Sequence, residues 1–295
     1  MINPSYKKFI PKEKAKQLLS GLEIDRPDEI DIELIAYKRG AMVILDHIEG
    51  AEARLNRSIN KGFITVSNEI PEEGRVRFNI AHELGHYELH KDEKTLTICT
   101  DEDLNQWYQT QGHLEMSANV FAAELLMPEN LFKPLVKNRK PSFAEIIKLA
   151  NIFNTTIMAT ATKFVEHTDE VCCLFISKEK KIKRFGTSKD FSYRVRLPGE
   201  SLNQDSEGYG FFENGHVNIS RPTQISADAW INDTKVDPNC LILEDTFAMP
   251  GYNTVLSLIW VKDPIEKDDH SNEGYLRDLD PESDLSPGGR KREFD

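Results

Sequence analysis

The sequence His82-Glu83-Leu84-Gly85-His86 constrains this chain more strongly than any other stretch. It lies within residues 77–90, where apolar residues recur at helical spacing, so we expect a helix. Histidines four residues apart lie on one face of a helix, one turn apart, where both imidazoles can bind one metal ion. Glu83 stands beside them, where its carboxylate can act as a base on water without ligating the metal. The spacing therefore predicts a hydrolytic metal centre.

The surroundings of this motif favour a functional site over a chance match. A string of this form occurs by chance in roughly one chain of this length in a hundred. Here the predicted helix has an apolar face, and residues 62–67 before it are predicted to form a β-strand. Gly85 removes side-chain bulk inside the motif, at a cost of about 1 kcal/mol of helix propensity relative to Ala. We expect this glycine to let another element pack close to the metal.

A catalytic zinc site needs a third protein ligand and an open coordination position. His90 lies one turn beyond His86 and is the nearest candidate in the sequence. About 12 Å of helix rise separates it from His82, however, so one ion cannot bind both. We therefore predict that His90 supports a ligand or packs in the core.

A second predicted helix, residues 114–127, supplies a better candidate. On a helical wheel Glu115 lies on a stripe of small and aliphatic residues that faces the core, whereas Glu124 points to the opposite side and is expected to be solvated. A buried carboxylate is costly unless it is paired or coordinates a metal, so Glu115 is the predicted third ligand. Asn119, one turn from Glu115, either orients that carboxylate or packs between the helices.

Two motifs resemble those of the ImmA/IrrE family of metallopeptidases: His82-Glu83-Leu84-Gly85-His86 and Glu115-Met116-Ser117-Ala118-Asn119-Val120-Phe121-Ala122-Ala123-Glu124-Leu125-Leu126-Met127-Pro128. The resemblance covers roughly residues 12–135 and is specific in both motifs. It implies a gluzincin-like site in which His82, His86 and Glu115 are the ligands and Glu83 is the base. It also implies a cytosolic bacterial or phage protein that cleaves a helix-turn-helix transcriptional repressor.

The expected chemistry is peptide hydrolysis with zinc, although two histidines and one carboxylate also accommodate Mn²⁺ or Fe²⁺. Glu83 is expected to take a proton from water and to deliver it to the leaving amine. An oxyanion donor is also expected, and Tyr87, His90 and Arg139 are the candidates. Two alternatives remain: a regulator that binds a repressor or DNA around a structural metal, and a ligand sensor. Glu83 argues against the first, because a structural site needs no base beside its ligands.

The chain is acidic, with a formal net charge of −12 over 295 residues. This charge argues against direct binding to nucleic acid or a membrane surface, and it suits a basic partner such as a DNA-binding repressor. Four cysteines without Cys-x-x-Cys spacing indicate reduced thiols in a cytoplasmic protein, with Cys172 and Cys173 in a strand core. The N-terminus lacks an apolar signal core, and no stretch approaches the ~20 apolar residues of a transmembrane helix.

The segment between the two motif helices is polar and is expected to be a solvated loop. It also contains candidates for secondary roles. Cys99 is a candidate inhibitory thiolate over the metal. The run Asp101-Glu102-Asp103 is a candidate attractor for basic substrate residues, and Asp101, Asp103 or His113 is the fallback third ligand.

The pattern predicts an α+β chain that begins with a zincin-like metallopeptidase domain, residues 1–140. Its predicted helices are residues 12–20 and 28–39, the latter capped by Asp28 or Asp31, and its small sheet comprises strands at 42–45, 53–59 and 62–67. Residues 141–168 then form two short helices joined at Asn154-Thr155, with helix-turn-helix proportions. The second helix offers only Lys163 as a cation, so a structural or protein-binding role is expected there rather than DNA recognition.

Residues 169–263 are predicted to form a β-rich α/β domain for sensing or substrate docking. Its predicted strands are residues 171–177, 181–185, 193–197, 211–219, 240–247 and 254–261. Trp230 and Trp260 either line a ligand pocket or, as we expect, pack in the core. Residues 263–295 contain eleven acidic and five basic side chains, so residues 264–295 are predicted to be a disordered acidic tail.

Overall fold

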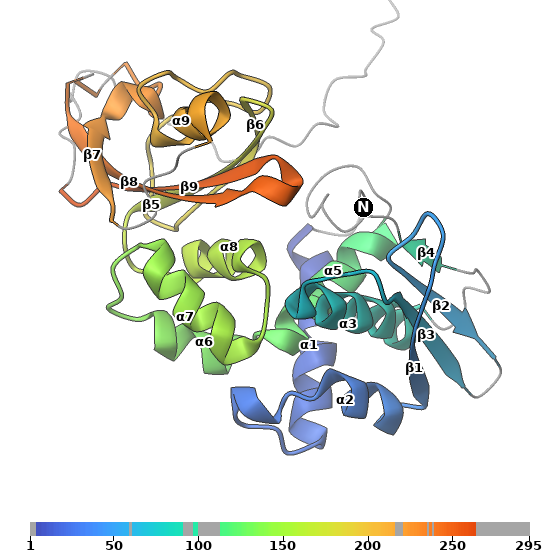
Figure 1. Cartoon of the computed structure of the whole chain (residues 1–295). Helices are drawn as coiled ribbons and strands as arrows, with labels where there is room; N and C mark the ends of the chain where they lie inside the picture. The colour runs from blue at the N-terminus through green and yellow to red at the C-terminus, as the bar shows by residue number, and fades with distance from the viewer. Residues whose placement is uncertain are drawn as a thin grey trace, which may run out of the picture.

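The computed structural model describes residues 4–58, 61–90, 97–99, 113–215, 221–234, 236–237 and 239–263. The N-terminal part combines helices with a small sheet, and the C-terminal part is a larger sheet covered by helices (Figure 1). The chain is therefore α+β, as predicted.

The N-terminal part contains a four-stranded sheet in the order β1-β3-β2-β4. Its elements are α1 (Pro4–Gly21), a 3-10 turn (Pro27–Glu29), α2 (Ile32–Lys38), β1 (Ala41–Asp46), β2 (Ala53–Arg57), β3 (Gly62–Ser67), α3 (Glu73–Leu89), β4 (Thr97–Cys99) and α5 (His113–Leu126). Strand β1 is parallel to β3, and the other pairs are antiparallel. The three predicted strands are confirmed as β1, β2 and β3. Asp31 caps α2, accepting a hydrogen bond from the Leu34 N–H at 3.0 Å.

Helix α3 carries the metal-binding motif and packs between the small sheet and α5. Ile80, Ala81 and Leu84 are almost fully buried in a core shared with the strands and α5. A Cβ atom added to Gly85 would lie 3.1 Å from Ala118 Cα and 3.1 Å from a ring carbon of Phe121, both on α5. The glycine therefore allows the close approach of the two helices that the motif led us to expect.

The variant Gly85→Ala tests this close approach. Alanine raises helix propensity by about 1 kcal/mol, but the added methyl group must displace α5, and such overpacking typically costs about 1–3 kcal/mol. We expect a lower urea midpoint of unfolding and weaker metal binding, because α5 carries Glu115. The control is Gly21→Ala, since nothing lies within 4 Å of its Cβ position. An unchanged midpoint for Gly85→Ala would contradict the packing argument.

Three helices follow α5: α6 (Glu129–Val136), α7 (Phe143–Phe153) and α8 (Ile157–His167). Ser142 and Thr156 cap α7 and α8, each accepting a hydrogen bond from a backbone N–H three residues further on. Asn154 ends α7 in the left-handed conformation, with φ 49°. The predicted helix pair joined at Asn154-Thr155 is confirmed. A Cβ atom on Gly74 of α3 would lie 2.7 Å from the Thr155 backbone, so this connection packs directly on α3.

Glu124 is not solvated, contrary to the prediction. Its side chain is fully buried and forms a salt bridge with Lys163 Nζ at 3.0 Å, which joins α5 to α8. Glu124 Oε1 also accepts a hydrogen bond from the Glu129 N–H at 2.9 Å. Burial lowers the pKa of the Lys163 ammonium, and the neighbouring Glu124 carboxylate opposes that shift. The helical wheel cannot show that α8 covers this side of α5.

Breaking this buried ion pair is expected to destabilise the chain. A buried charge left without its partner typically costs about 3–5 kcal/mol, so Lys163→Met should lower the free energy of unfolding by that order. The double variant Glu124→Gln/Lys163→Met should regain most of the loss, because no charge remains buried. Thermal unfolding followed by circular dichroism measures both, with Lys148→Met on the exposed side of α7 as the control. Equal midpoints for the single and double variants would contradict this account.

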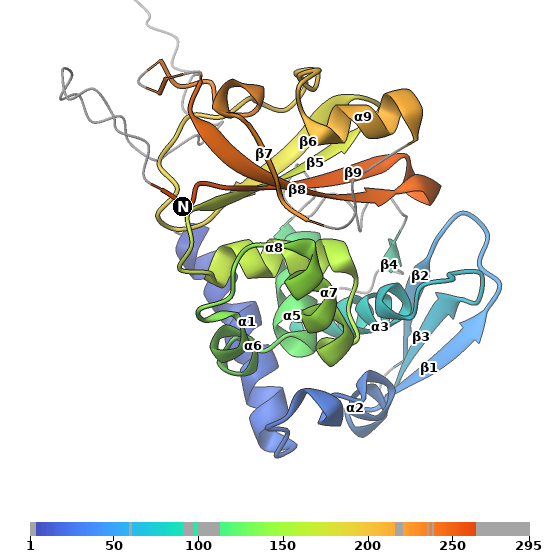
Figure 2. The ribbon, with the colours of Figure 1, turned by 60° about the vertical axis from the view of Figure 1, so that its left-hand side comes forward.

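The C-terminal part is a five-stranded sheet in the order β6-β5-β9-β8-β7. Its strands are β5 (Cys172–Lys178), β6 (Lys181–Thr187), β7 (Thr223–Ser226), β8 (Leu241–Met249) and β9 (Thr254–Trp260). Helix α9 (Glu207–Asn214) covers one face of the sheet, and α7 and α8 cover the other (Figure 2). All of these strand pairs are antiparallel. The region is β-rich as predicted, and its sheet is antiparallel with helices packed on both faces.

Four of the predicted C-terminal strands are confirmed as β5, β6, β8 and β9, and two are wrong. Residues 211–214 belong to helix α9, which Ser206 caps and Gly215 ends with φ 70°; residues 216–219 lie outside the described residues. Within 193–197, the described pairing is an isolated bridge between Val195 and Ile231. Ser206 and Gly215 are ordinary helix start and stop signals, and they outweigh the apolar alternation between them. Strand β7 has no counterpart among the predicted strands.

Both faces of this sheet are buried, and the tryptophans are part of its core. Trp230 is 0% exposed and Trp260 is 8% exposed, which confirms the core assignment. Cys172 and Cys173 are buried on β5 as predicted, and together with Cys240 they are free thiols in the described part of the chain. None of the helices described here combines the length and apolar character needed to cross a bilayer.

Candidate metal centre

His82, His86 and Glu115 converge on one point between α3 and α5. His82 Nε2 lies 3.0 Å from His86 Nε2 and 3.1 Å from Glu115 Oε2, and His86 Nε2 lies 3.3 Å from Glu115 Oε2. Both histidines are buried, whereas the Glu115 side chain is 23% exposed. The three predicted ligands therefore share one site that is open on the side of Glu115.

The spacing of these donor atoms fits a metal ion. Ligand atoms about 2.1 Å from one zinc ion in tetrahedral geometry lie roughly 3.4 Å apart, close to the spacing found here. Two imidazole nitrogens that face each other at 3.0 Å need a proton or a cation between them. A metal ion satisfies both imidazoles and the carboxylate at once. Within the described part of the chain, this is the one group of three or more such side chains close enough to share an ion.

Asn119 orients His82. Asn119 Oδ1 lies 2.8 Å from His82 Nδ1, and an amide oxygen only accepts hydrogen bonds. Nδ1 of His82 therefore carries the proton, and Nε2 keeps its lone pair for the metal. Asn119 thus acts on a histidine and not on Glu115, which corrects the orienting role considered for it from the sequence.

A chain of hydrogen bonds orients His86 in the same way. His86 Nδ1 lies 3.1 Å from His90 Nδ1, His90 Nε2 lies 2.9 Å from Ser117 Oγ, and Ser117 Oγ donates to the Leu114 carbonyl at 2.7 Å. Because the Ser117 proton is used on Leu114, its oxygen accepts from His90 Nε2, and His90 Nδ1 accepts from His86 Nδ1. His86 then presents an unprotonated Nε2 to the metal. His90 supports a ligand, as predicted.

Arg57 and Ser117 are site residues that the sequence reasoning missed. The Arg57 guanidinium donates to the backbone carbonyls of His86 at 2.8 Å and His90 at 3.0 Å, which fixes the last turn of α3. Ser117 stands between Glu115 and Asn119 in the second motif, and this position is the signal that could have found it. Arg57 comes from β2, and no local pattern marks it.

The electrostatics of the site favour a charged carboxylate. Burial alone would raise the pKa of Glu115, but the neighbouring imidazoles of His82 and His86 hold the pKa of that carboxyl well below its usual range. Burial lowers the pKa of His90 to about 4, so its imidazole is neutral at pH 7 and its Nδ1 can accept a hydrogen bond from His86. Burial would also lower the pKa of His82, but Glu115 and Glu83 shift it upward overall. A proton therefore competes with a metal for His82 Nε2.

Glu83 and the candidate oxyanion donors occupy different environments. Glu83 is fully buried on α3 between the two histidine ligands in the sequence, and its role as a base stays a prediction. His90 lies beside His86, and the Tyr87 ring lies under the Arg57 guanidinium. Arg139 bonds instead to the Glu145 carboxylate and the Leu135 carbonyl. His90 already donates its one proton to Ser117, so Tyr87 remains the oxyanion-donor candidate on α3.

Most of the polar segment before α5 lies outside the described residues. The side chain of Cys99 and the run 101–103 lie outside the described residues, so their predicted roles stay predictions. His113 is exposed at the start of α5 and is not part of the converging group. Glu115 is the α5 residue that reaches the two histidines.

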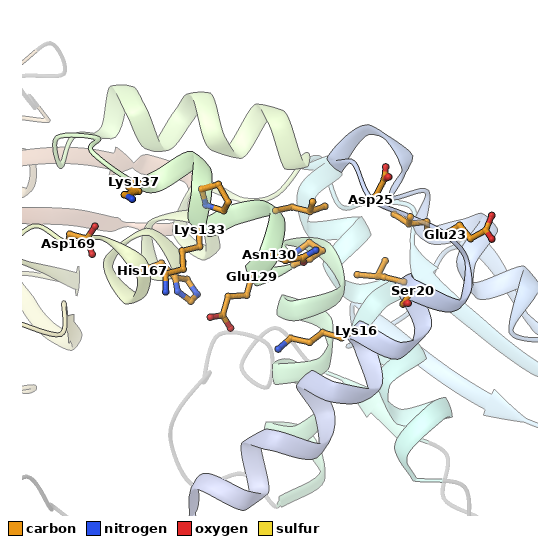
Figure 3. A pocket seen from close by; sticks show the side chains of 15 residues that line it. Lys16, Ser20, Glu23, Asp25, Glu129, Asn130, Lys133, Lys137, His167 and Asp169 are labelled. Carbon is orange, nitrogen blue, oxygen red and sulfur yellow. The ribbon is translucent and has the colours of Figure 1, made fainter.

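The structure also has a groove that lies away from the metal centre. This groove of about 1120 Å³ runs between the end of α1 with the residues after it, helix α6 and the end of α8 (Figure 3). Its walls carry Lys16, Lys133 and Lys137 alongside Glu129 and Asp169, and the three metal ligands are not among its lining residues. The groove therefore does not contribute to the metal chemistry.

Asn119→Ala tests how far the metal centre depends on the orientation of His82. Removing a partner that orients a metal-binding histidine typically lowers metal affinity by about 10–100-fold. We expect that loss for Asn119→Ala in a competition titration with a chromophoric chelator. Asn119→Asp keeps an acceptor for His82 Nδ1 and should retain most of the affinity. Equal affinities for Asn119→Ala and the unmodified protein would contradict the proposed tautomer.

Comparison with known proteins agrees with the geometry of this centre. The family described as Peptidase_M78, IrrE N-terminal-like domain, matches residues 38–164. A search of curated proteins found no match. Among solved structures, a Mycobacterium tuberculosis transcriptional regulator has a similar fold, with a TM-score of 0.54 and 14% sequence identity over 85% of this chain and 76% of that chain. Because the matched segment contains all three converging side chains, residues 38–164 belong to the M78 metallopeptidases of the ImmA/IrrE family, with His82, His86 and Glu115 as the metal site.

Proposed function

We propose that this protein is a zinc-dependent endopeptidase that cleaves a helix-turn-helix transcriptional repressor. The observation that carries the catalytic part is the convergence of His82 Nε2, His86 Nε2 and a Glu115 oxygen within 3.3 Å of one another. The hydrogen bonds at the two Nδ1 atoms leave both Nε2 lone pairs directed at this point. Zinc is the proposed metal because two histidines and one carboxylate form a common catalytic zinc set, and Mn²⁺ also fits.

Glu83 is the proposed general base. A zinc ion bound by these ligands supplies Lewis-acid chemistry, polarising the scissile carbonyl and making water more acidic. Glu83 takes the proton from the attacking water on its carboxylate and delivers it to the nitrogen of the leaving amine. The backbone of α3 holds Glu83 next to His82, and its complete burial keeps bulk water away from the carboxylate. Glu115 stays negatively charged, because its low pKa prevents protonation near neutral pH.

A DNA-binding repressor is the proposed substrate. The net charge of −12 favours association with a basic protein. A protein of similar fold is described as a transcriptional regulator, which motivates the regulatory context. Direct DNA recognition by α7 and α8 is disfavoured, because Lys163, the lysine of α8, is engaged in the buried pair with Glu124. We place this activity in the cytoplasm, where free thiols such as Cys172, Cys173 and Cys240 are stable.

The C-terminal sheet is proposed to control access or to dock the substrate. The buried side of β5 and β9 shares one apolar core with α6, α7 and α8, and Asp245 Oδ2 of β8 accepts a hydrogen bond from the Phe143 N–H at 2.6 Å. Helix α8 is in turn joined to α5 by the Glu124–Lys163 salt bridge. A repressor bound to this C-terminal part would therefore be held against the same body that carries the metal ligands.

Glu83→Gln separates chemistry from metal binding. The variant should keep its fold and its zinc, because Glu83 is not one of the converging ligands. Cleavage should fall by about 100-fold or more, the scale of general acid–base catalysis. The assay incubates the zinc-loaded protein with a purified helix-turn-helix repressor, chosen from the genes that neighbour its own, and mass spectrometry identifies new chain ends.

The outcomes of this assay distinguish enzyme from binder. Glu88→Gln serves as the matched control, because this buried glutamate pairs with Arg39 and lies on the same helix outside the ligand group. If zinc-loaded Glu83→Gln fully releases the repressor from its operator DNA and no new chain ends appear, a non-catalytic regulator would be favoured. Cleavage of unfolded casein but not of the repressor would keep the peptidase and reject the proposed substrate.

A further inference from the structure

Strand β1 forms an exposed apolar edge of the small sheet. It lies at one end of the strand order β1-β3-β2-β4, and β3 is its one partner among the described strands (Figure 1). Met42, Ile44 and Leu45 are 47%, 40% and 54% exposed. Natural proteins usually protect such an edge with charges, proline or a bulge. Residues 41–45 contain none of these, and their pairing with β3 is regular.

The backbone of β1 has hydrogen-bonding groups available for another strand. The carbonyl groups of Gly40 and Asp46 accept hydrogen bonds from Gly62 and Asn68, on the β3 side. Backbone groups alternate between the two sides of a strand. The N–H and C=O groups of Ala41, Val43 and Leu45 therefore point away from β3, towards the open edge.

The ends of β1 carry opposite charges. Lys38, exposed at the end of α2, precedes the strand, and Asp46 is exposed at its last position. An antiparallel copy of the same strand would place each lysine near the aspartate of the other copy. A parallel copy would bring like charges together. The charge pattern is therefore complementary to itself in the antiparallel direction.

We propose that β1 is the interface through which two copies of this chain form a dimer, by antiparallel pairing centred on Val43. In this register Ala41 lies opposite Leu45 of the second copy, and Val43 lies opposite its equivalent. These are the residues whose backbone groups point outward, so all three pairs form hydrogen bonds. Met42 then faces Ile44 of the second copy on the outer face of the sheet. The exposed apolar side chains of both copies gain apolar neighbours, and the two small sheets become continuous.

This interface lies away from the catalytic groups. Strand β1 is at the opposite end of the sheet from β4, and α3 packs against β2 and β3. Met42 and Ile44 do not belong to the apolar core that packs around α3 and α5. The dimer would therefore leave each metal centre complete within its own chain.

Sedimentation velocity of the full chain tests the proposal. We expect twice the mass of the 33.7 kDa chain at about 100 μM, a concentration that detects even weak specific association. Ile44→Lys should raise the dimer dissociation constant at least tenfold without changing the circular dichroism spectrum or the zinc content. Leu241→Lys, at a 63% exposed leucine on β8, is the matched control and should remain dimeric. A monomeric wild type, or a dimer unaffected by Ile44→Lys, would overturn the proposal.

A charge exchange tests the antiparallel register. Lys38→Glu and Asp46→Lys should each weaken self-association, because like charges then meet at both ends of the paired strands. A mixture of the two variants should form a heterodimer, since every contact again joins opposite charges. The double variant Lys38→Glu/Asp46→Lys should dimerise as the wild type does. Failure of the mixture to associate would overturn the antiparallel pairing, even if Ile44→Lys is monomeric.

Discussion

The close contact between α3 and α5 is the constraint on which the rest of the metal centre depends. Two of the ligands come from α3 and the third from α5, so the site exists only where these helices nearly touch. Gly85 and Ala118 make that approach possible, because a Cβ atom on Gly85 would lie 3.1 Å from Ala118 Cα. Leu84 and Phe121 are buried in an apolar core that both helices share, and this packing stabilises the pair.

Hydrogen bonds around this contact decide the chemical state of the ligands. Asn119 fixes the tautomer of His82, and His90 with Ser117 fixes that of His86. Both sets of hydrogen bonds end on residues of α5, so the helix that carries Glu115 also orients the histidines of α3. A metal site needs correctly directed lone pairs as much as the right residue types. The packing of α3 against α5 therefore sets both the distances between the three ligands and the tautomers of the two histidines.

The metal centre is also connected to the C-terminal half through buried polar contacts. Glu124 pairs with Lys163 on the side of α5 that faces away from the ligands, and Asp245 caps the start of α7. Buried charges tolerate little displacement, since an unpaired charge in the core is costly. Helices α5 and α8 and the sheet are therefore held in a defined arrangement. This rigidity suits the substrate docking that we propose for the C-terminal sheet.

The sequence by itself determined the local features of this protein. The spacing of His82 and His86, the caps at Asp31 and Ser142, and most strands of the two sheets follow from patterns within a few residues, because hydrogen bonding and side-chain periodicity are local. Glu115 could be predicted as a metal ligand from the sequence, because a carboxylate on an apolar helix stripe needs a charged partner or a metal.

Only the tertiary structure decided which distant surfaces meet. It buried Glu124 against Lys163, directed Asn119 to His82 and brought Arg57 from β2 to the end of α3. A helical wheel shows which side chains share a face, but it does not show whether a neighbouring helix or solvent covers that face. Residues 211–214 belong to helix α9, because Ser206 and Gly215 mark the two ends of the helix. Strands β8 and β9 provide the surface on which it packs. Long-range packing, which no local pattern encodes, set these outcomes.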